Sequence, residues 1–485
     1  MQCLCLTHFA DGGTMMGNVL QTEAPMQRNT TDFSTGSVKR HIIAQALPLT
    51  LAQAVQLLYN IVDRMYIGHL EGVGQIALTG LGITFPVIVL IAAFTQLVGV
   101  GGTPLFSMAR GRRDEKEAEA ILGNAFTLLL IAAAGCFIVG YFFRKPILFA
   151  FGASEESYFY ADQYLRTYLW GTAFSMVTTG LNGYINAQGF PKIGMATTII
   201  GAVINIVLDP FFIFVFDMGI EGAALATVIS QGVSCAWVMR FLTGKKALIR
   251  LRRSCIRVDI PRARRICALG VTGFVMQGTN SLASIVCNNQ LQLFGERMMV
   301  GGGDLYVGVM TVLSSVREML GLPVGGIASG SQPVIGFNYG AGKYDRVKEG
   351  IRFSALLGAG YTIISWAVVM LIPRVMIAMF TDDATTIDVG ARMLNIYFFG
   401  FVFMAFQFAG QSTFQGLGKA KQAIFFAIFR KIVIIAPLTL LLPRVGFGVE
   451  GVFIAEPVSN IVGGLCCFTT MWLTLYKKLD APAKA

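Results

Sequence analysis

Residues 193–216 read IGMATTIIGAVINIVLDPFFIFVF, a run of 24 residues with one ionisable side chain, Asp209. About 20 apolar residues are enough to cross the hydrocarbon core of a bilayer, so this run predicts a transmembrane helix. A charged side chain at the centre of such a helix costs about 2.5–3.5 kcal/mol on insertion scales. A membrane helix tolerates that cost mainly where the acid faces a cavity, a partner or an ion, which makes Asp209 a candidate functional residue.

Two neighbours of Asp209 supply further polar groups. Asn205 lies one helical turn earlier, on the same face of the helix. Pro210 follows directly and cannot donate a hydrogen bond to the carbonyl of Ile206. A carboxylate, an amide and a freed carbonyl on one patch of a helix are the ligands that a small cation or a proton relay requires.

The composition extends this interpretation to the whole chain. Hydrophobic residues make up 54% of the 485 residues and charged residues 13%, whereas soluble proteins have about 25% charged residues. We therefore predict an all-α polytopic membrane protein. The net charge of +11 is typical of the cytoplasmic loops of a membrane protein, so we expect no nucleic-acid partner. The nine cysteines lie mostly in apolar stretches and predict neither a disulfide framework nor a metal site.

Apolar stretches separated by polar breaks predict twelve transmembrane helices. We place them at residues 42–67, 77–108, 116–142, 158–188, 193–216, 221–243, 264–294, 304–336, 345–372, 387–416, 420–442 and 450–476. Lys and Arg gather in every second connection, about 20 on one side of the membrane against about six on the other. The positive-inside rule then places both termini in the cytoplasm, for a multi-pass protein of the cell membrane.

The two halves of the chain resemble each other at a shift of about 227–230 residues. Matching segments include QGFPK at 188–192 and QGLGK at 415–419, Pro210 and Pro437, and GIEG at 219–222 and GVEG at 448–451. Each repeat holds six spans, so both have the same orientation and are related by a pseudo-two-fold axis along the membrane normal. Asp209 aligns with Ala436 and Asn205 with Ile432, so the acid site is predicted in the N-terminal half only.

This organisation predicts five regions. They are a disordered cytoplasmic tail over 1–40, a six-helix bundle over 41–243, a basic cytoplasmic linker over 244–263, a second six-helix bundle over 264–476 and a cytoplasmic tail over 477–485. Two like bundles that face each other enclose a central cleft, and rocking one bundle against the other opens the cleft to either side.

A polar stripe on the first span leads to a second acid. The stripe consists of Gln53, Gln56, Asn60 and Asp63. Asp63, Asp209 and Thr227 all lie in the outer half of their helices, so we expect these three residues and Asn205 to share one site. Two nearby acids in a low dielectric titrate as a unit, and either a proton or Na⁺ could occupy the site. The alternatives are an Asp63–Arg64 pair at the interface and a structural role for Asp209.

The C-terminal half carries amides where the N-terminal half carries acids. One stripe is Gln277, Asn280, Ser284 and Asn288, and another is Gln407, Gln411 and Gln415. They favour equally a wet wall of the cleft and hydrogen bonds between helices. Glu318 follows Arg317 and could pair with it, whereas Glu456 is a second candidate proton site. Arg430 and Lys431 could counter either acid.

Four runs of sequence resemble the MATE (multidrug and toxic compound extrusion) family. They are LYNIVDRMYIG at 58–68, LNGYINAQGFPK at 181–192, NIVLDPFFIF at 205–214 and SQPVIGFNYGAGKYDRV at 331–347. The likeness covers roughly residues 41–476 and is nearest to the MepA-type and DinF-type branches. It implies a V-shaped, monomeric antiporter without a cofactor, which expels amphiphilic and often cationic drugs against H⁺ or Na⁺.

The resemblance also implies roles for individual residues. The coupling cation corresponds to Asp63, Asn205, Asp209 and Thr227, and the substrate contacts correspond to Gln56, Tyr164, Asn182 and Gln231. To these we add Gln277 and Asn280 from the amide stripe as predicted substrate contacts. Pro48 corresponds to a proline whose bending is proposed to couple protonation to drug release.

Two other functions compete with drug export. A flippase for lipids or lipid-linked saccharides would carry several cations in its cleft, where only Arg166, Arg317, Arg392, Arg430 and Lys431 could enter. An intramembrane protease would need Gly-x-Gly-Asp around Asp209 or a zinc-binding HExxH motif, and the chain has neither. We therefore expect that the protein is not an enzyme.

Overall fold

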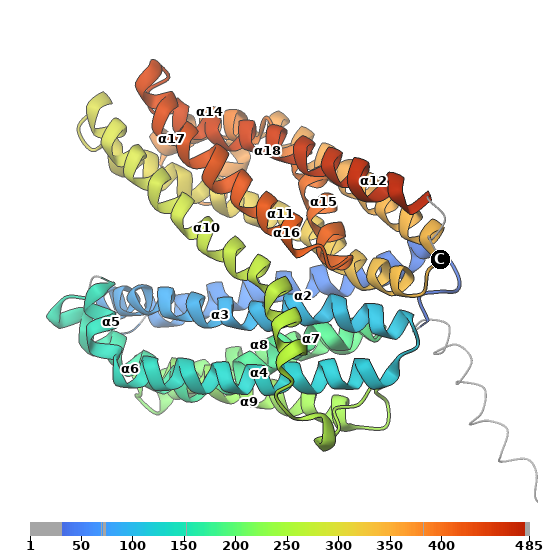
Figure 1. Ribbon diagram of the computed structural model, residues 1–485. Helices are drawn as coiled ribbons and strands as arrows, with labels where there is room; N and C mark the ends of the chain where they lie inside the picture. The colour runs from blue at the N-terminus through green and yellow to red at the C-terminus, as the bar shows by residue number, and fades with distance from the viewer. Residues whose placement is uncertain (1–31, 69, 71–73, 152, 382, 481–485) are drawn as a thin grey trace, which may run out of the picture.

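The computed structural model describes residues 32–68, 70, 74–151, 153–381 and 383–480. Every regular element within these ranges is helical, which confirms the predicted all-α class. The long helices of the described chain form twelve rods in two groups, which meet at one end and diverge toward the other, as in a V (Figure 1).

The first group of rods, the N bundle, contains the predicted spans one to six. Its helices are α2 (Val38–Gly68), α3 (Gly74–Gly111), α4 (Glu115–Phe142), α5 (Arg144–Ala150), α6 (Glu155–Trp170), α7 (Thr172–Ala187), α8 (Pro191–Pro210), the π-helical η1 (Phe211–Val215) and α9 (Gly219–Thr243). The predicted fourth span is divided between α6 and α7 at Gly171. The short helix α5, which follows the third rod, was not predicted.

The second group, the C bundle, contains spans seven to twelve. After η2 (Arg253–Cys255) in the linker come α10 (Ile260–Met298), α11 (Gly302–Gly340), α12 (Tyr344–Leu371), α13 (Pro373–Ala378), α14 (Ala384–Phe398), η3 (Phe401–Phe403), α15 (Met404–Gly416), α16 (Ala420–Ile428), the π-helical η4 (Phe429–Ile435), α17 (Ala436–Leu441), η5 (Leu442–Val445), α18 (Glu450–Met471), η6 (Trp472–Tyr476) and η7 (Lys477–Asp480). Helix α13 follows the third rod of this bundle, as α5 does in the N bundle.

Nine helices of the described chain are long and apolar enough to cross a membrane, or ten if the bent pair α14 and α15 forms one span. The fourth rod is missed by this criterion because α6 and α7 are only 16 residues each. The seventh rod, α10, is 39 residues long, but its amide stripe lowers its hydropathy. Both therefore cross the bundle as rods without the apolar signature of the others.

The backbone repeats with a fixed shift. Four pairs of described residues with left-handed φ angles are each separated by 229 positions: Arg113 and Gly342, Gly189 and Gly418, Asp217 and Gly446, and Gly219 and Gly448. Left-handed residues mark the turns that connect the rods, so equivalent turns follow equivalent helices. The shift of 229 places Asp209 opposite Leu438 and Asn205 opposite Ile434, two residues beyond the predicted partners Ala436 and Ile432.

The two bundles touch through glycines at the end that carries the basic loops. Helix α3 contacts α10 and α11, and α2 contacts α11. A Cβ atom on Gly111 would lie 2.0 Å from the carbonyl oxygen of Phe337, and one on Gly340 would lie 2.1 Å from that of Met108. Both pairs are related by the same shift of 229 residues, so the contact is self-complementary about the pseudo-two-fold axis.

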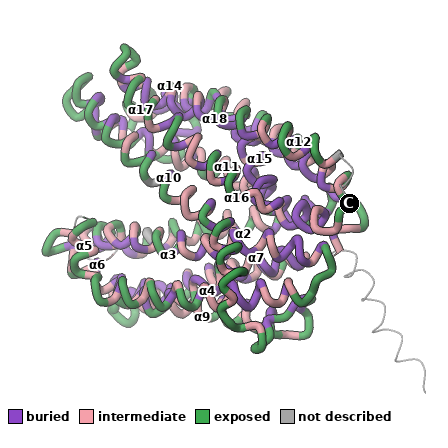
Figure 2. Tube along the Cα trace, in the orientation of Figure 1, coloured by how far each residue is buried: buried purple, intermediate pink, exposed green. Residues whose placement is uncertain are grey.

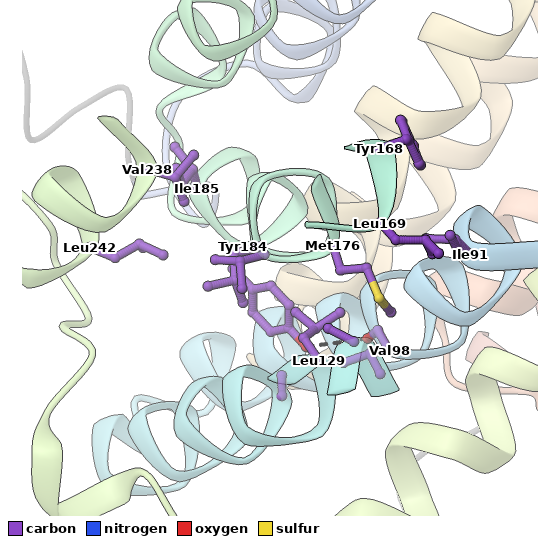
Figure 3. Packing of buried hydrophobic residues seen from close by; sticks show 14 of the residues in the cluster. Ile91, Val98, Leu129, Tyr168, Leu169, Met176, Tyr184, Ile185, Val238 and Leu242 are labelled. Atoms are coloured by element: carbon purple, nitrogen blue, oxygen red, sulfur yellow. Dashed lines mark hydrogen bonds between the residues drawn. The ribbon is translucent and has the colours of Figure 1, made fainter. Parts of the chain in front are cut away.

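Buried residues line the interior of each bundle, while exposed ones follow the outer faces of the rods (Figure 2). In the N bundle, Tyr184 is fully buried beside Leu129 and Met176 (Figure 3). Its hydroxyl donates a hydrogen bond of 3.5 Å to the carbonyl of Val98. This contact joins α7 to α3 and helps to fix the framework on which the candidate site is built.

Part of the predicted N-terminal tail is described. Phe33 is buried, and the carbonyls of Phe33, Thr35 and Gly36 accept hydrogen bonds of 2.8–3.1 Å from the guanidinium of Arg346. Helix α2 begins at Val38, within the predicted tail. Residues 1–31 of this tail and 481–485 of the C-terminal tail lie outside the described residues.

Candidate functional site

A hydrogen-bonded group occupies the interior of the N bundle. The side-chain amide of Asn205 donates to Asp209 Oδ1 at 3.1 Å and to Thr227 Oγ1 at 3.3 Å. Asn205 and Asp209 belong to α8 and Thr227 to α9, so the amide ties two helices together. The three residues are 1%, 0% and 2% exposed, respectively, so water has almost no access to them.

Asp63 on α2 adds a second acid to this group. It is 7% exposed, and its carboxylate lies close enough to interact electrostatically with Asp209 and with the hydroxyl of Tyr164. Helix α2 packs directly on α8, which explains the approach. The structure thus brings together all four residues predicted for the coupling site, called the acid group below. The alternative partner, Arg64, has a side chain outside the described part of the structure.

Two tyrosines line the acid group. Tyr59 on α2 and Tyr164 on α6 lie close to the side chains of Thr227 and Asp63. The ring of Tyr164 stacks on that of Tyr168, with centroids 6.0 Å apart. Tyr164 was predicted from the sequence, and Tyr59 was not. The available signal was its position one turn before Asp63, since a buried tyrosine hydroxyl needs a polar partner.

The acid group retains acceptor oxygens. Within the described residues, Asn205 Oδ1 and Asp209 Oδ2 are buried and have no hydrogen-bond partner. Oxygen atoms of this kind suit a hard cation, and a carboxylate oxygen also suits a proton. No group of three or more His, Cys, Asp or Glu in the described chain could hold a metal ion.

The backbone after Asp209 is irregular. Helix α8 ends at Pro210 and continues as the π-helical turn η1. A proline lacks the amide hydrogen that would hold the preceding turn, and π-helical turns often occur at functional sites. The acid therefore lies at the point where its helix is least regular, as the position of Pro210 predicts.

The predicted substrate contacts differ in their surroundings. Gln56 on α2 and Asn280 on α10 are exposed, whereas Gln277 and Gln231 are partly buried. Asn182 donates to the carbonyl of Gly194 at 3.1 Å and so links α7 to α8. Of the six predicted residues, Tyr164 is the one that reaches the acid group.

Two further predictions concern Pro48 and the amide stripe on α15. Helix α2 is continuous through Pro48. Gln411 donates to the carbonyl of Ala423 at 2.9 Å, and Gln415 accepts from Gln332 at 2.6 Å. Of the two interpretations of the amide stripe on α15, these bonds favour contacts between helices.

The interior of the C bundle holds a cluster of three basic residues around one acid, in contrast to the two acids of the N bundle. Glu456 forms ion pairs with Arg317 at 3.0 Å, Arg430 at 3.4 Å and Lys431 at 3.7 Å. The sequence allowed a pair between Arg317 and its neighbour Glu318. Arg317 turns instead to Glu456, because consecutive residues of a helix project in different directions, and Glu318 is exposed.

Comparison with known proteins agrees with the fold. The MatE family model matches residues 48–211 and 281–441, one segment in each half of the chain. Among curated relatives, the multidrug export protein MepA of Staphylococcus haemolyticus (strain JCSC1435) is 23% identical over 441 residues, covering 91% of this chain and 94% of that protein. MepA of Staphylococcus aureus (strain MRSA252) is 22% identical over 443 residues, covering 91% and 95%.

Solved structures of similar fold include an outward-facing multidrug resistance MATE transporter of the MOP superfamily, with a TM-score of 0.85 and 23% identity. A MATE protein in its bent conformation has a TM-score of 0.86 and the same identity. Each covers 93% of this chain, and 99% of each solved chain is matched. The family match, which covers a large part of each six-helix bundle, shows that this chain belongs to the MatE family of multidrug efflux transporters and has their twelve-helix fold.

Proposed function

We propose that the protein exports amphiphilic organic cations in exchange for H⁺ or Na⁺ by alternating access. The observation that carries this proposal is the acid group, in which a fully buried carboxylate keeps one oxygen without a hydrogen-bond partner in the described structure. The curated relatives named MepA are multidrug export proteins, which supports drugs as the exported class.

The bundles meet at the end with the basic loops, which the positive-inside rule assigns to the cytoplasm. The V therefore opens to the outside, and both termini lie in the cytoplasm. The acid group takes a proton or Na⁺ from the outer side, and release of that ion to the inner side leaves a negative site for a cationic drug. Each charge that moves inward across 100 mV supplies about 2.3 kcal/mol. A single chain contains both bundles, so we propose that the monomer is the transporting unit.

The test is efflux of the cationic dye rhodamine 123 from proteoliposomes, with a pH gradient or a Na⁺ gradient imposed separately. We expect one gradient to drive efflux in the wild type, and neither to do so in Asp63→Asn or Asp209→Asn. The matched control is Asp217→Asn, which removes an exposed acid beyond the end of η1. Asparagine tolerates its left-handed backbone. Failure of both gradients in the wild type would contradict the proposal.

A further inference from the structure

A cavity in the C bundle contains charges that the acid group does not use. Its volume is about 260 Å³, and residues of α10, α11, α14, η4 and α18 line it. The exposed Asn288 of α10 and Thr311 of α11 lie at its entrance, while Lys431 and Glu456 are buried within it. Polar groups thus continue from the surface to buried charges.

Two cationic side chains of this cavity, Arg317 and Lys431, lack a full set of hydrogen-bond partners in the described structure. Within the described chain, Arg317 Nε has no hydrogen-bond partner. The ammonium of Lys431 has one ion pair there, to Glu456 at 3.7 Å, which is beyond hydrogen-bonding distance. Arg317 and Lys431 of the lining therefore share the carboxylate of Glu456 with the neighbouring Arg430, and Glu318, the other acid of the lining, is exposed to water. A buried cation without a full set of partners is costly, so an added anion would be stabilised here.

We propose that this cavity binds the anionic group, a carboxylate or a phosphate, of an amphiphilic substrate. Guanidinium and ammonium groups form strong charge-assisted hydrogen bonds with such anions. The hydroxyl of Tyr397, which lies close to Ser314, adds a neutral donor to the lining. Glu456 acts as an internal counter-ion that shares the cations with the ligand. This inference rests on the proposed export function, because it names a further chemical feature of the exported molecule.

The position of the cavity supports access from the cleft. Most of its lining comes from α10 and α11, the helices of the C bundle that contact α3 and α2 of the N bundle (Figure 1). The acid group of the N bundle suits the positive part of a molecule, and the basic cavity of the C bundle suits its negative part. The substrate class that fits both is a zwitterionic amphiphile.

The test compares two dyes that differ in one group. Rhodamine 110 carries a free carboxylate, and rhodamine 123 is its methyl ester. Equilibrium binding to the purified full chain in detergent is measured by fluorescence anisotropy. We expect the wild type to bind rhodamine 110 more tightly. We expect Lys431→Gln to lower the affinity for rhodamine 110 by about tenfold and to change the affinity for rhodamine 123 by less than about twofold.

Two variants make this comparison secure. Arg392→Gln removes a cation from the surface of the same bundle, where Arg392 pairs with Glu450 at 2.5 Å, and should change neither dye. If Lys431→Gln does not fold, Arg317→Gln removes the other, partly exposed cation of the lining while Glu456 keeps its pairs with Arg430 and Lys431, and we expect the same selective loss. Equal binding of both dyes by the wild type, or an equal loss of both in the variants, would overturn the anion site.

A lipid could supply the anion in place of a soluble substrate. Binding is therefore repeated in nanodiscs of phosphatidylcholine with and without phosphatidylglycerol. Competition by phosphatidylglycerol in the wild type, but not in Lys431→Gln, would assign the site to a lipid phosphate; absence of competition would assign it to the soluble amphiphile. Gradient-driven efflux of rhodamine 123 tests the proposed function separately. If no gradient drives efflux but the wild type still binds rhodamine 110 more tightly than rhodamine 123, the proposed function is contradicted and the anion site is not.

Discussion

The two bundles share one backbone plan but carry opposite charges in their interiors. The N bundle holds two acids together with an amide and a hydroxyl, and the C bundle holds three cations around Glu456. Their turns nevertheless follow each other at a constant 229 residues. The difference teaches that the repeat conserves helix ends and close contacts, while a few buried side chains give each bundle its own chemistry.

The largest expected effect separates the acids of the two bundles. Asp209→Asn should reduce gradient-driven rhodamine 123 efflux to the rate without a gradient, because an amide exchanges no proton and balances no Na⁺ charge. Glu456→Gln should retain driven efflux when rates are corrected for the amount of folded protein. Driven efflux in Asp209→Asn, or its complete loss in folded Glu456→Gln, would break the distinction between the two bundles.

Asp209→Asn and Glu456→Gln should rank in the opposite order by their effect on stability, with the larger loss in Glu456→Gln. Glu456→Gln leaves the buried Lys431 and the partly buried Arg317 and Arg430 without their counter-ion, which should lower the free energy of unfolding by about 3 kcal/mol. Thermal unfolding in detergent, followed by tryptophan fluorescence, measures the change. Glu318→Gln on the exposed side of the cluster is the control and should have almost no effect. A Glu456→Gln protein as stable as the wild type would show that the cations do not depend on this acid.

A third prediction concerns the contact where the halves are alike. Gly111→Ala and Gly340→Ala should each weaken the joined end of the bundles by roughly 1–3 kcal/mol, since the new methyl groups overlap carbonyl oxygens. Spin-label distances between the bundles should lengthen at this end by similar amounts in both variants. Gly135→Ala and Gly360→Ala are the controls, because an added Cβ meets nothing within 4 Å there. Unequal effects at Gly111 and Gly340 would contradict the symmetry.

The smallest effect is expected at a pair of equivalent turns where one half has arginine and the other has glycine. Arg113 has φ of 59°, whereas its equivalent Gly342 has φ of 71°. The left-handed region costs a residue with a Cβ about 1–2 kcal/mol. Replacing Arg113 by glycine would relieve this strain, but part of the gain in stability is lost because glycine has a larger conformational entropy in the unfolded chain. Arg113→Gly should therefore stabilise the protein by up to about 1 kcal/mol, and Gly342→Arg should destabilise it, as judged by melting temperature. A lower melting temperature for Arg113→Gly would show that the contacts of the Arg113 side chain stabilise the fold by more than its left-handed backbone costs.

The helical fold could be predicted from sequence because apolar length and loop charge are local properties. The predicted first rod, 42–67, and the observed α2 differ by only a few residues at each end. The short helices α5 and α13 were missed because six or seven residues are too few for a periodic signal. The register of the repeat was two residues off around Asp209, because Pro210 and Pro437 do not occupy equivalent positions within their rods.

The site was predictable in part. The spacing of Asn205 and Asp209 on one helix face is fixed by helical geometry, and a depth estimate placed Asp63 and Thr227 nearby. The cluster around Glu456 was not predicted as a unit, because it depends on how α11, η4 and α18 pack. Sequence adjacency favoured the pair Arg317–Glu318, and only the packed structure shows which carboxylate Arg317 faces.

The reciprocal contact of Gly111 and Gly340 has a consequence for the kinetics of the conformational cycle. Dispersion between closely packed backbones falls steeply, so a gap of 0.5–1 Å already loses about a quarter to a half of the attraction. Two symmetric contacts of this kind break together as the bundles part. We therefore expect the joined end to behave as a bistable latch, with closed and open populations and few intermediates, rather than as a hinge that yields gradually.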